Sequence, residues 1–391
     1  MTARSVDTLV TGGRVVTASD VVEAAVAIEG GKIVALGPAS MLPPAERTID
    51  AGGKYVLPGL IDCHLHVGPE YDDWKTAPVA AARTGLTTLL PFVIYDEGET
   101  LPQAAARLRE EAEALSVLDF GFHFILNHEP RILDGIPDAF RLGVTSFKLF
   151  MTYKKRGKRM VSDEFIAKTM ERLARLGGLC QLHCENGDVL CYLEDKAIAE
   201  GRTAPTDFPA TCPDWTEEEA INRAVLIGRL TGCPAYVVHL STKLGLERII
   251  VDAEGKPIPF GAPSLETLVP LMYSEGVVKR GLPITWLARV LSENPARIFG
   301  LYPRKGAIRI GADADLTIWD PAPEGTIART QHLGIAGFTP YEGWKVRGRP
   351  WMTLVRGQVV LNPQGEVEPK PGAGRYLACA SPLPPVSGAV R

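Results

Sequence analysis

The sequence lacks the features that mark several large classes of protein. No apolar run approaches the ~18 residues that span a lipid bilayer, and the first residues do not join a charged segment to an apolar one as a secretory signal does. Lysine and arginine number 42 against 46 aspartates and glutamates, which gives a formal net charge of −4. Because nucleic acids and acidic membranes favour a basic face, we expect neither as a partner.

Paired cysteines are also lacking. No Cys-x-x-Cys pair and no regular spacing occurs among the seven cysteines, which are Cys63, Cys180, Cys184, Cys191, Cys212, Cys233 and Cys379. Several of them lie in or beside apolar runs, where a free thiol behaves as a small hydrophobe. This usage favours a reducing, cytoplasmic environment over a disulfide framework.

The two ends of the chain share a residue pattern that is typical of β-strands. Apolar and polar residues alternate over 8–16 and 22–35, and short strand-like segments return at 315–320, 343–347 and 352–361. We predict that residues 1–57 and 305–377 form one β-sandwich, followed by a tail over 378–391. The alternative is two separate β units, each of which would be too small to bury a good core.

The centre of the chain alternates apolar and helical segments. Six segments are typical of buried strands: 57–64, 87–92, 120–126, 146–151, 179–184 and 235–240. Helical spacing marks 101–115, 163–176 and 216–231, the last with a capping-box pattern at Thr216 and Glu219. Such α/β alternation predicts a parallel sheet covered by helices, and the repeats indicate a (β/α)₈ TIM-like barrel over residues 58–304.

Two strands of that barrel are not recognisable. After a helical stretch at 242–253 the chain passes through 255–263 into helices at 265–274 and 284–299. The expected barrel therefore lacks strands 7 and 8 in this chain.

His64 and His66 directly follow an apolar strand. In an extended segment, residues i and i+2 point to the same face, so the two imidazoles could bind one metal ion. They would lie at the C-terminal end of their strand, where the active sites of barrels are found. The spacing alone is a weak signal, and an ordinary structural role is the alternative.

His183 and His239 each end an apolar strand. A single histidine in such a position is more often structural than a ligand. However, four of only seven histidines in the chain occupy strand ends, and imidazole suits zinc and similar divalent metals.

Lys148 alternates with Phe147 and Leu149 in a strand, so we expect it to point into the barrel. Burying an unpaired ammonium group is costly. It could form an ion pair with a carboxylate. With its pKa lowered by desolvation, it could instead react with CO₂ to give a carbamate whose two oxygens can bridge two metal ions. The residues alone leave both possibilities open.

These residues lie in segments that resemble the cyclic amidohydrolases, most closely the hydantoinase and dihydropyrimidinase group. The resemblance is carried by Gly-Leu-Ile-Asp-Cys-His-Leu-His at 59–66 and Ser-Phe-Lys-Leu-Phe-Met-Thr-Tyr at 146–153. Further matching segments follow in order at 182–187, 238–241, 261–266, 292–296, 311–316 and 341–344. Together they span almost the whole chain.

The resemblance implies two divalent metal ions, usually zinc. It implies that His64 and His66 bind the first ion, that His183 and His239 bind the second, and that Lys148, carboxylated by CO₂, bridges both. A hydroxide made nucleophilic by the metals would attack the ring amide carbonyl. Tyr153 matches the tyrosine that donates a hydrogen bond to the developing oxyanion, and the alternative for it is an ordinary packing role.

The sequence departs from this family at one functional position. Family members carry a strand-8 aspartate, in a Ser-Asp-His context, that ligates the first metal and shuttles a proton. No Ser-Asp-His sequence occurs here, and the family's Pro-Pro-Leu-Arg segment is absent too. Three accounts are open. The natural protein carries a segment that this chain lacks, the protein is a deletion variant with weak or no activity, or another acid such as Asp252 or Glu266 substitutes.

We therefore expect a metal-dependent hydrolase that opens a small cyclic amide of the hydantoin or dihydropyrimidine type. The family leads us to expect a homodimer or homotetramer. The alternative is a non-catalytic homologue acting as a binding or assembly protein, which the missing aspartate favours and the retained site residues oppose. An amidohydrolase for acyclic or nucleobase substrates is opposed by Lys148. We interpret the charged loop at 156–159 as solvated surface rather than a substrate clamp.

Overall fold

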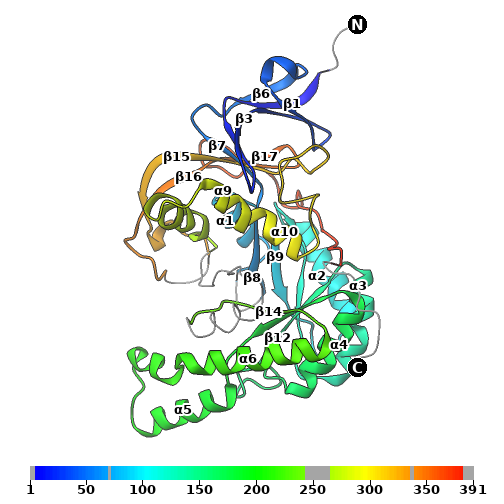
Figure 1. Ribbon diagram of the computed structural model, residues 1–391, viewed down its shortest axis with the longest axis vertical. Helices are drawn as coiled ribbons and strands as arrows, with labels where there is room; N and C mark the ends of the chain where they lie inside the picture. The colour runs from blue at the N-terminus through cyan, green and yellow to red at the C-terminus, as the bar shows by residue number, and fades with distance from the viewer. Residues whose placement is uncertain (1–4, 69–71, 243–264, 335–338, 382–391) are drawn as a thin grey trace. The chain divides into compact units, whose positions relative to one another are not determined.

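The computed structural model describes residues 5–68, 72–242, 265–334 and 339–381. Figure 1 follows the chain in colour from the N-terminus to the C-terminus. The chain divides into two compact units. The first comprises Met1–Pro91, Arg107–Gly121 and Pro263–Cys379, and the second comprises Phe92–Ala106, Phe122–Ala262 and Ala380–Arg391.

Two β-sheets lie in the first unit. The four-stranded sheet, in the order β5-β4-β1-β6, contains β1 (Val6–Thr11), β4 (Ala25–Glu29), β5 (Lys32–Gly37) and β6 (Ala45–Asp50). The six-stranded sheet, in the order β17-β16-β15-β7-β2-β3, contains β2 (Arg14–Val16), β3 (Val21–Glu23), β7 (Tyr55–Pro58), β15 (Leu316–Thr326), β16 (Lys345–Val355) and β17 (Gln358–Leu361). Antiparallel pairing of β7 with β15 joins the N-terminal and C-terminal parts of the chain.

One hydrophobic core serves both sheets. Its buried residues include Val10 and Ile28 from the four-stranded sheet and Val56, Ile318 and Leu354 from the six-stranded sheet. Burial of β-branched and leucine side chains is the main force that holds such layers together. The two ends of the chain thus contribute to the same core, as a joint sandwich requires, while the boundaries at 57 and 305 stay predictions.

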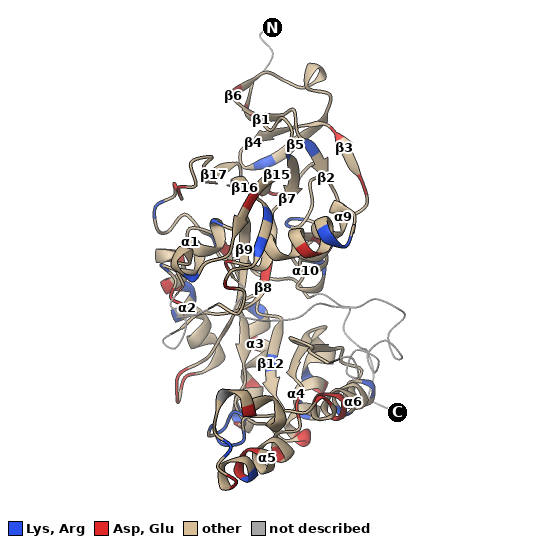
Figure 2. Ribbon diagram, turned by 90° about the vertical axis from the view of Figure 1, so that its left-hand side faces the viewer, with Lys and Arg blue, Asp and Glu red and all other residues tan. Residues whose placement is uncertain are grey.

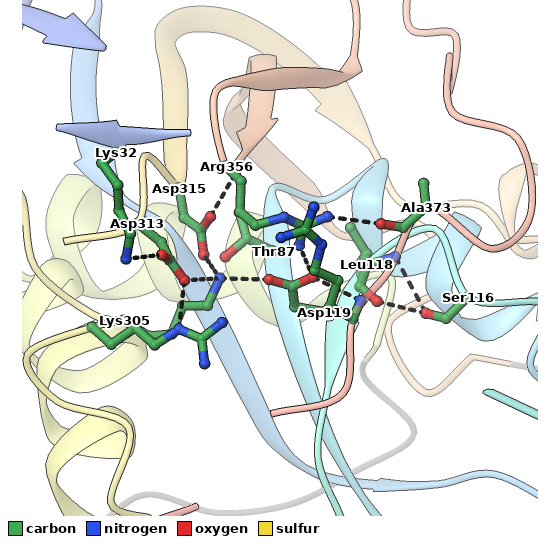
Figure 3. Close-up of polar contacts among 12 residues, drawn as sticks. Lys32, Thr87, Ser116, Leu118, Asp119, Lys305, Asp313, Asp315, Arg356 and Ala373 are labelled. Atoms are coloured by element: carbon green, nitrogen blue, oxygen red, sulfur yellow. Dashed lines mark hydrogen bonds and ion pairs between the residues drawn. The ribbon is translucent and has the colours of Figure 1, made fainter. Parts of the chain in front are cut away.

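A buried ion network completes the first unit (Figure 3). The Lys305 side chain is 1% exposed, and its Nζ lies 2.6 Å from Asp119 Oδ2, 2.5 Å from Asp315 Oδ2 and 3.1 Å from Asp313 Oδ2. Arg356 forms a second ion pair with Asp119, and its backbone N–H donates to Asp315 at 2.8 Å. The network explains the two aspartates of the 311–316 segment, since both carboxylates bind the same lysine.

Asp119 begins β10 (Asp119–Phe120), which pairs in parallel with β9 (Leu86–Val93), and β9 also pairs with β8 (Leu60–His66). The helical segments of this unit are α1 (Ala77–Ala82), α8 (Leu268–Leu271), the π-helical η4 (Met272–Lys279), α9 (Ile284–Ala288), the π-helical η5 (Arg289–Glu293) and α10 (Asn294–Ile298). Two short 3₁₀ segments, η1 (Ala39–Met41) and η6 (Arg329–Gln331), lie in its loops.

The second unit is a parallel sheet with helices. Its strands run in the order β11-β12-β13-β14, from β11 (His123–Ile125), β12 (Ser146–Phe150), β13 (Leu179–His183) and β14 (Ala235–Val237). Its helices are α3 (Ile136–Arg141), α4 (Asp163–Leu176), α5 (Gly187–Ala199) and α6 (Asp214–Thr231), with 3₁₀ segments η2 (Pro130–Gly135) and η3 (Pro205–Thr211). Helix α2 (Leu101–Leu115) begins in this unit and ends in the first.

The α/β class and the parallel sheet confirm the coarse prediction of fold. Helices α2 and α4 have the predicted bounds. The predicted capping box was wrong, because α6 begins at Asp214 and the Thr216 hydroxyl donates to the Pro213 carbonyl at 2.8 Å instead of capping the helix. Glu219 accepts from the Asn186 side chain at 2.7 Å.

The region expected to lack strands 7 and 8 lies mostly outside the described residues, since 243–264 are not among them. In the ranges that are described, the parallel sheet contains no strand beyond β14. No helix in those ranges is both long and apolar enough to cross a membrane.

Candidate metal centre

His64 and His66 lie at the end of β8, in the first unit. Their ring centroids are 6.2 Å apart, with an angle of 71° between the planes. The Asp62 carboxylate fixes this strand end by accepting a hydrogen bond from the His64 backbone N–H at 2.9 Å. Burial raises the pKa of Asp62, and that hydrogen bond opposes the rise. A hydrogen bond from the backbone to Asp62 therefore constrains the end of the strand that carries the two imidazoles.

Three other expected site residues meet in the second unit. The rings of His183 and His239 lie 4.3 Å apart at an interplanar angle of 74°, and the Tyr153 ring lies 5.1 Å from that of His183. His183 ends β13, whereas Tyr153 and His239 follow β12 and β14. Because parallel strands end on the same side of a sheet, three residues far apart in sequence converge.

The backbone of this cluster is unusual. Among the described residues, Tyr153 (φ 68°) and His239 (φ 37°) are two of the three non-glycine residues with positive φ. Such conformations are rare for residues with a Cβ and cost on the order of 1–3 kcal/mol each. The surrounding structure holds both residues in place, and strain of this kind is concentrated at functional sites.

Lys148 lies in β12 and is 1% exposed. Its Nζ lies over the rings of Phe92 and Phe150, at 4.3 and 5.0 Å from their centroids. Burial, with a smaller contribution from the nearby Arg159 charge, lowers the pKa of Lys148 to about 7. Within the described part of the chain no carboxylate forms an ion pair with this lysine, so the ion-pair alternative has no support there.

His183 has a carboxylate partner. Its Nε2 lies 2.6 Å from Glu185 Oε2, which leaves Nδ1 as the ring nitrogen that could bind a metal. Burial lowers the pKa of His183, and the hydrogen bond and charge of Glu185 oppose this effect. A neutral imidazole that donates its other N–H to a carboxylate is the usual arrangement of a metal-binding histidine.

A cavity of about 720 Å³ opens beside these residues. Its lining includes Tyr153, His183 and His239, with Leu190 and Phe208 among the apolar walls. This volume is within the usual range for small-molecule sites, roughly 300–1,000 Å³. The cavity can therefore admit a small organic substrate next to the two imidazoles.

Residues of helices α5 and α6 form hydrogen bonds and ion pairs with the loops that line the cavity. Glu217 of α6 accepts hydrogen bonds from the backbone N–H and the hydroxyl of Ser241, at 3.0 and 3.2 Å, just after His239. Lys154 pairs with Asp188, and Lys155 pairs with Glu194 and Asp195 of α5. Figure 2 shows residues of both charge signs along α5.

Glu185 and Glu217 were not among the predicted site residues. Glu185 stood in the matched segment 182–187, and its spacing of two from a candidate ligand was a usable signal. Glu217 gave no local signal, because its partner Ser241 is 24 residues away.

The charged loop 156–159 lies largely at the surface. Arg156 and Lys158 are exposed as expected. Arg159 is half-buried instead, with its guanidinium 5.4 Å from the Phe150 ring centroid. Of the proposed substitute acids, Glu266 accepts hydrogen bonds from the backbone of Leu333 and Gly334 in the first unit, and Asp252 lies outside the described residues.

The donor set fits a metal ion only with help from Lys148. Counting histidine, cysteine and carboxylate side chains alone, the described ranges contain no group of three placed to bind one ion. His183 and His239 supply two imidazoles, so a third ligand must be of another kind. A lysine whose pKa lies near 7 holds a large neutral fraction at neutral pH, and the neutral amine is the form that reacts with CO₂.

Comparison with known proteins gives one consistent result. The sequence profile of the amidohydrolase family matches residues 55–360. The D-hydantoinase of Ralstonia pickettii is 32% identical over 455 aligned residues, which cover 95% of this chain and 98% of that protein. The dihydropyrimidinase of Rattus norvegicus is 28% identical, with 94% of this chain and 88% of that protein covered.

Solved structures agree with the sequences. The crystal structure of dihydropyrimidinase from Brevibacillus agri NCHU1002 matches with a TM-score of 0.88 at 30% identity, covering 96% of this chain and 99% of that one. A structure of D-hydantoinase also matches with a TM-score of 0.88 at 30% identity, covering 97% and 100%. On this agreement of sequence and fold, the chain belongs to the amidohydrolase family, as a member of its hydantoinase and dihydropyrimidinase type.

Proposed function

We propose that this protein hydrolyses the amide bond of a small cyclic amide of the hydantoin or dihydropyrimidine type, using two divalent metal ions. The observation that carries the proposal is the convergence of His183, His239 and Tyr153 at a cavity. Lys148, whose pKa is lowered by burial, lies on the same sheet. The names of the relatives support the substrate class.

The proposed ligands are those that the family resemblance implies. His183 and His239, with carboxylated Lys148, would hold one ion. His64 and His66 would hold the other. Zinc is the proposed metal, since imidazole and carboxylate-type oxygens suit it. When bound, the ions lower the pKa of water and polarise the carbonyl oxygen of the substrate.

The other steps belong to protein side chains. The Tyr153 hydroxyl donates a hydrogen bond to the carbonyl oxygen as negative charge develops there. Glu185 holds the His183 ring by accepting from its Nε2 at 2.6 Å. Leu190 and Phe208 give the cavity an apolar surface against which the substrate ring would pack.

The missing aspartate bears on the rate. An alignment of 455 residues with a chain of 391 leaves at least 64 alignment positions without a counterpart here. This supports the proposal that a segment holding barrel strands 7 and 8 is deleted. Loss of a general acid and base typically costs 10²–10⁴ in rate, so we propose turnover well below that of a full-length relative.

The rival idea of a non-catalytic assembly protein finds no support in the comparisons, because the relatives named above are enzymes. We also propose a homodimer or homotetramer, on the strength of the family resemblance alone. A cytoplasmic location is proposed because all seven cysteines are free thiols.

A direct assay tests the function. The purified chain is loaded with Zn²⁺ and bicarbonate, its metal content is measured, and ring opening of hydantoin and dihydrouracil is followed. We expect bound zinc and slow turnover that the Lys148→Ala and His183→Ala variants lose. A zinc-loaded chain that opens neither ring, under conditions where a D-hydantoinase does, would overturn the proposal.

A further inference from the structure

A buried glutamine has no role in the site described so far. Gln181 of β13 is 0% exposed, and neither its Oε1 nor its Nε2 has a hydrogen-bond partner within the ranges that the structure describes. Buried amide groups are nearly always paired, because an unpaired polar atom loses its hydrogen bonds to water without compensation. The carboxamide is therefore suited to a group that the bare polypeptide does not contain.

The strand register places this amide beside Lys148. Strands β12 and β13 are parallel, and Lys148 is the Cα partner of Gln181. Partners across neighbouring strands direct their side chains to the same face of the sheet. Gln181 also shares a face with His183, two residues further along β13. The face thus carries a lysine, an amide and a candidate metal ligand in adjacent positions.

Lys148, like Gln181, has no polar partner among the described residues. Its Nζ contacts the aromatic rings of Phe92 and Phe150, and in the described ranges no ion pair involves it. Among the described residues, two adjacent buried polar groups thus lack a hydrogen-bond partner while Lys148 is unmodified. Both would be satisfied by one modification, since a lysine carbamate offers one N–H donor and two oxygen acceptors, and a carboxamide offers one acceptor and two donors.

We propose that Gln181 is a positioning residue for carboxylated Lys148, an inference that rests on the proposed function. Its Oε1 accepts from the carbamate N–H, and its Nε2 donates to a carbamate oxygen. This pairing fixes the plane of the carbamate, and so would orient an oxygen toward the ion that His183 and His239 would hold. Groups that orient metal ligands in this way typically change metal affinity by about 10–100-fold when removed.

Carboxylation of Lys148 conserves atoms and charge. The neutral Nζ of Lys148 attacks the carbon of CO₂, so that an N–C bond forms and one C–O π pair moves onto oxygen. The nitrogen then loses a proton to solvent, and the product is an anionic carbamate. Gln181 takes no part in bond making, and it stabilises the product by hydrogen bonds alone.

The test measures the carbamate and the metal directly. Wild-type protein and the Gln181→Met variant are equilibrated with ¹³C-bicarbonate and Zn²⁺. The carbamate is read by ¹³C NMR, and bound zinc is read by mass spectrometry. Methionine keeps the length of the side chain and removes both polar atoms. We expect Gln181→Met to lose most of the carbamate signal and to bind zinc about 10–100-fold more weakly.

A purely structural glutamine predicts a different result. Replacing an unpaired buried amide by an apolar side chain would then leave the fold as stable as before, with wild-type carbamate and zinc. That outcome overturns the inference while leaving Lys148 carboxylation intact. Absence of a Lys148-dependent signal in the wild type would instead overturn the carboxylation on which the inference rests.

Two further variants keep the test decisive. Thr353→Val removes another fully buried polar atom without a described partner, far along the sequence in β16, and should leave carbamate and zinc unchanged. Gln181→Glu keeps the shape but adds a charge that pairs with the lysine ammonium. We expect it to abolish the carbamate, so that a wild-type signal in this variant contradicts the proposal even if Gln181→Met fails to fold.

Discussion

The Nε2 of His183 lies 2.6 Å from Oε2 of Glu185, two residues away on the same chain segment. The carboxylate fixes one tautomer of the ring and leaves Nδ1 directed away from it. Spacing of two residues lets a strand-end histidine and its orienting group come from one short segment. One short segment therefore supplies both the proposed metal ligand and the carboxylate that orients it.

Removing that support should weaken metal binding. We expect Glu185→Ala to reduce zinc affinity by about 10–100-fold, because the His183 ring loses the group that orients it. Glu185→Gln should have a smaller effect, since its amide oxygen still accepts from Nε2–H. Zinc titration with a competing chelator measures both. As a control, Glu194→Gln alters a cavity carboxylate that pairs with the exposed Lys155, and unchanged affinity in Glu185→Ala would contradict the assignment.

Tyr153 should affect turnover and leave metal binding unchanged. Loss of one hydrogen-bond donor to a developing oxyanion typically lowers kcat by about 10²–10³, and we expect this from Tyr153→Phe. Zinc content should remain that of the wild type, because the hydroxyl is not a proposed ligand. Tyr192→Phe, on an α5 residue that is 64% exposed, is the matched control. A wild-type kcat in Tyr153→Phe would assign the tyrosine to packing.

The Lys305 network makes a prediction about stability. Lys305→Met leaves the carboxylates of Asp119, Asp313 and Asp315 buried without their shared cation. Breaking a buried pair in this way typically costs about 3–5 kcal/mol, which urea unfolding would show. Lys168→Met removes an exposed pair with Glu164 on α4 and should cost less than about 0.5 kcal/mol. Equal effects of the two substitutions would contradict a structural role for the buried network.

The helices of this protein differ in how well they could be predicted from the sequence. Helices α2 and α4 were predicted within their observed bounds because the spacing of their apolar residues is a local signal. Helix α5 was missed although Asn186 caps it, accepting from the Val189 N–H at 3.2 Å, which is a start signal readable from sequence.

Long-range contacts were beyond the sequence. The histidines could be assigned to strand ends, but the 4.3 Å contact of His183 with His239 depends on the order of strands β13 and β14. Lys305 binds Asp119, 186 residues away, and nothing local marks that lysine as buried. Pairing of this kind follows from strand register and packing, which periodicity does not encode.

Asp313 links the same network to pH. Burial alone would raise the pKa of this carboxyl, but Lys305, Lys32 and Arg304 together lower the pKa below its ordinary value of 3.8. The unfolded chain therefore takes up the proton first as the pH falls. The carboxylate stabilises the fold fully above the unfolded-state pKa, and this contribution is lost as the pH falls through the folded-state pKa.

Replacing Asp313 should make the free energy of unfolding less dependent on pH in the acid range. Asp313→Asn removes the titrating group, so its free energy of unfolding should be lower than that of the wild type near neutrality. The difference between the two proteins should shrink as the pH falls below about 4. Urea unfolding across that range measures it. Asp188→Asn, from an exposed pair with Lys154, should change stability little at any of these pH values because solvent screens the pair. A difference between wild type and Asp313→Asn that stays constant from neutral to acid pH would show that the carboxylate acts through its shape and hydrogen bonds, and that its charge contributes nothing.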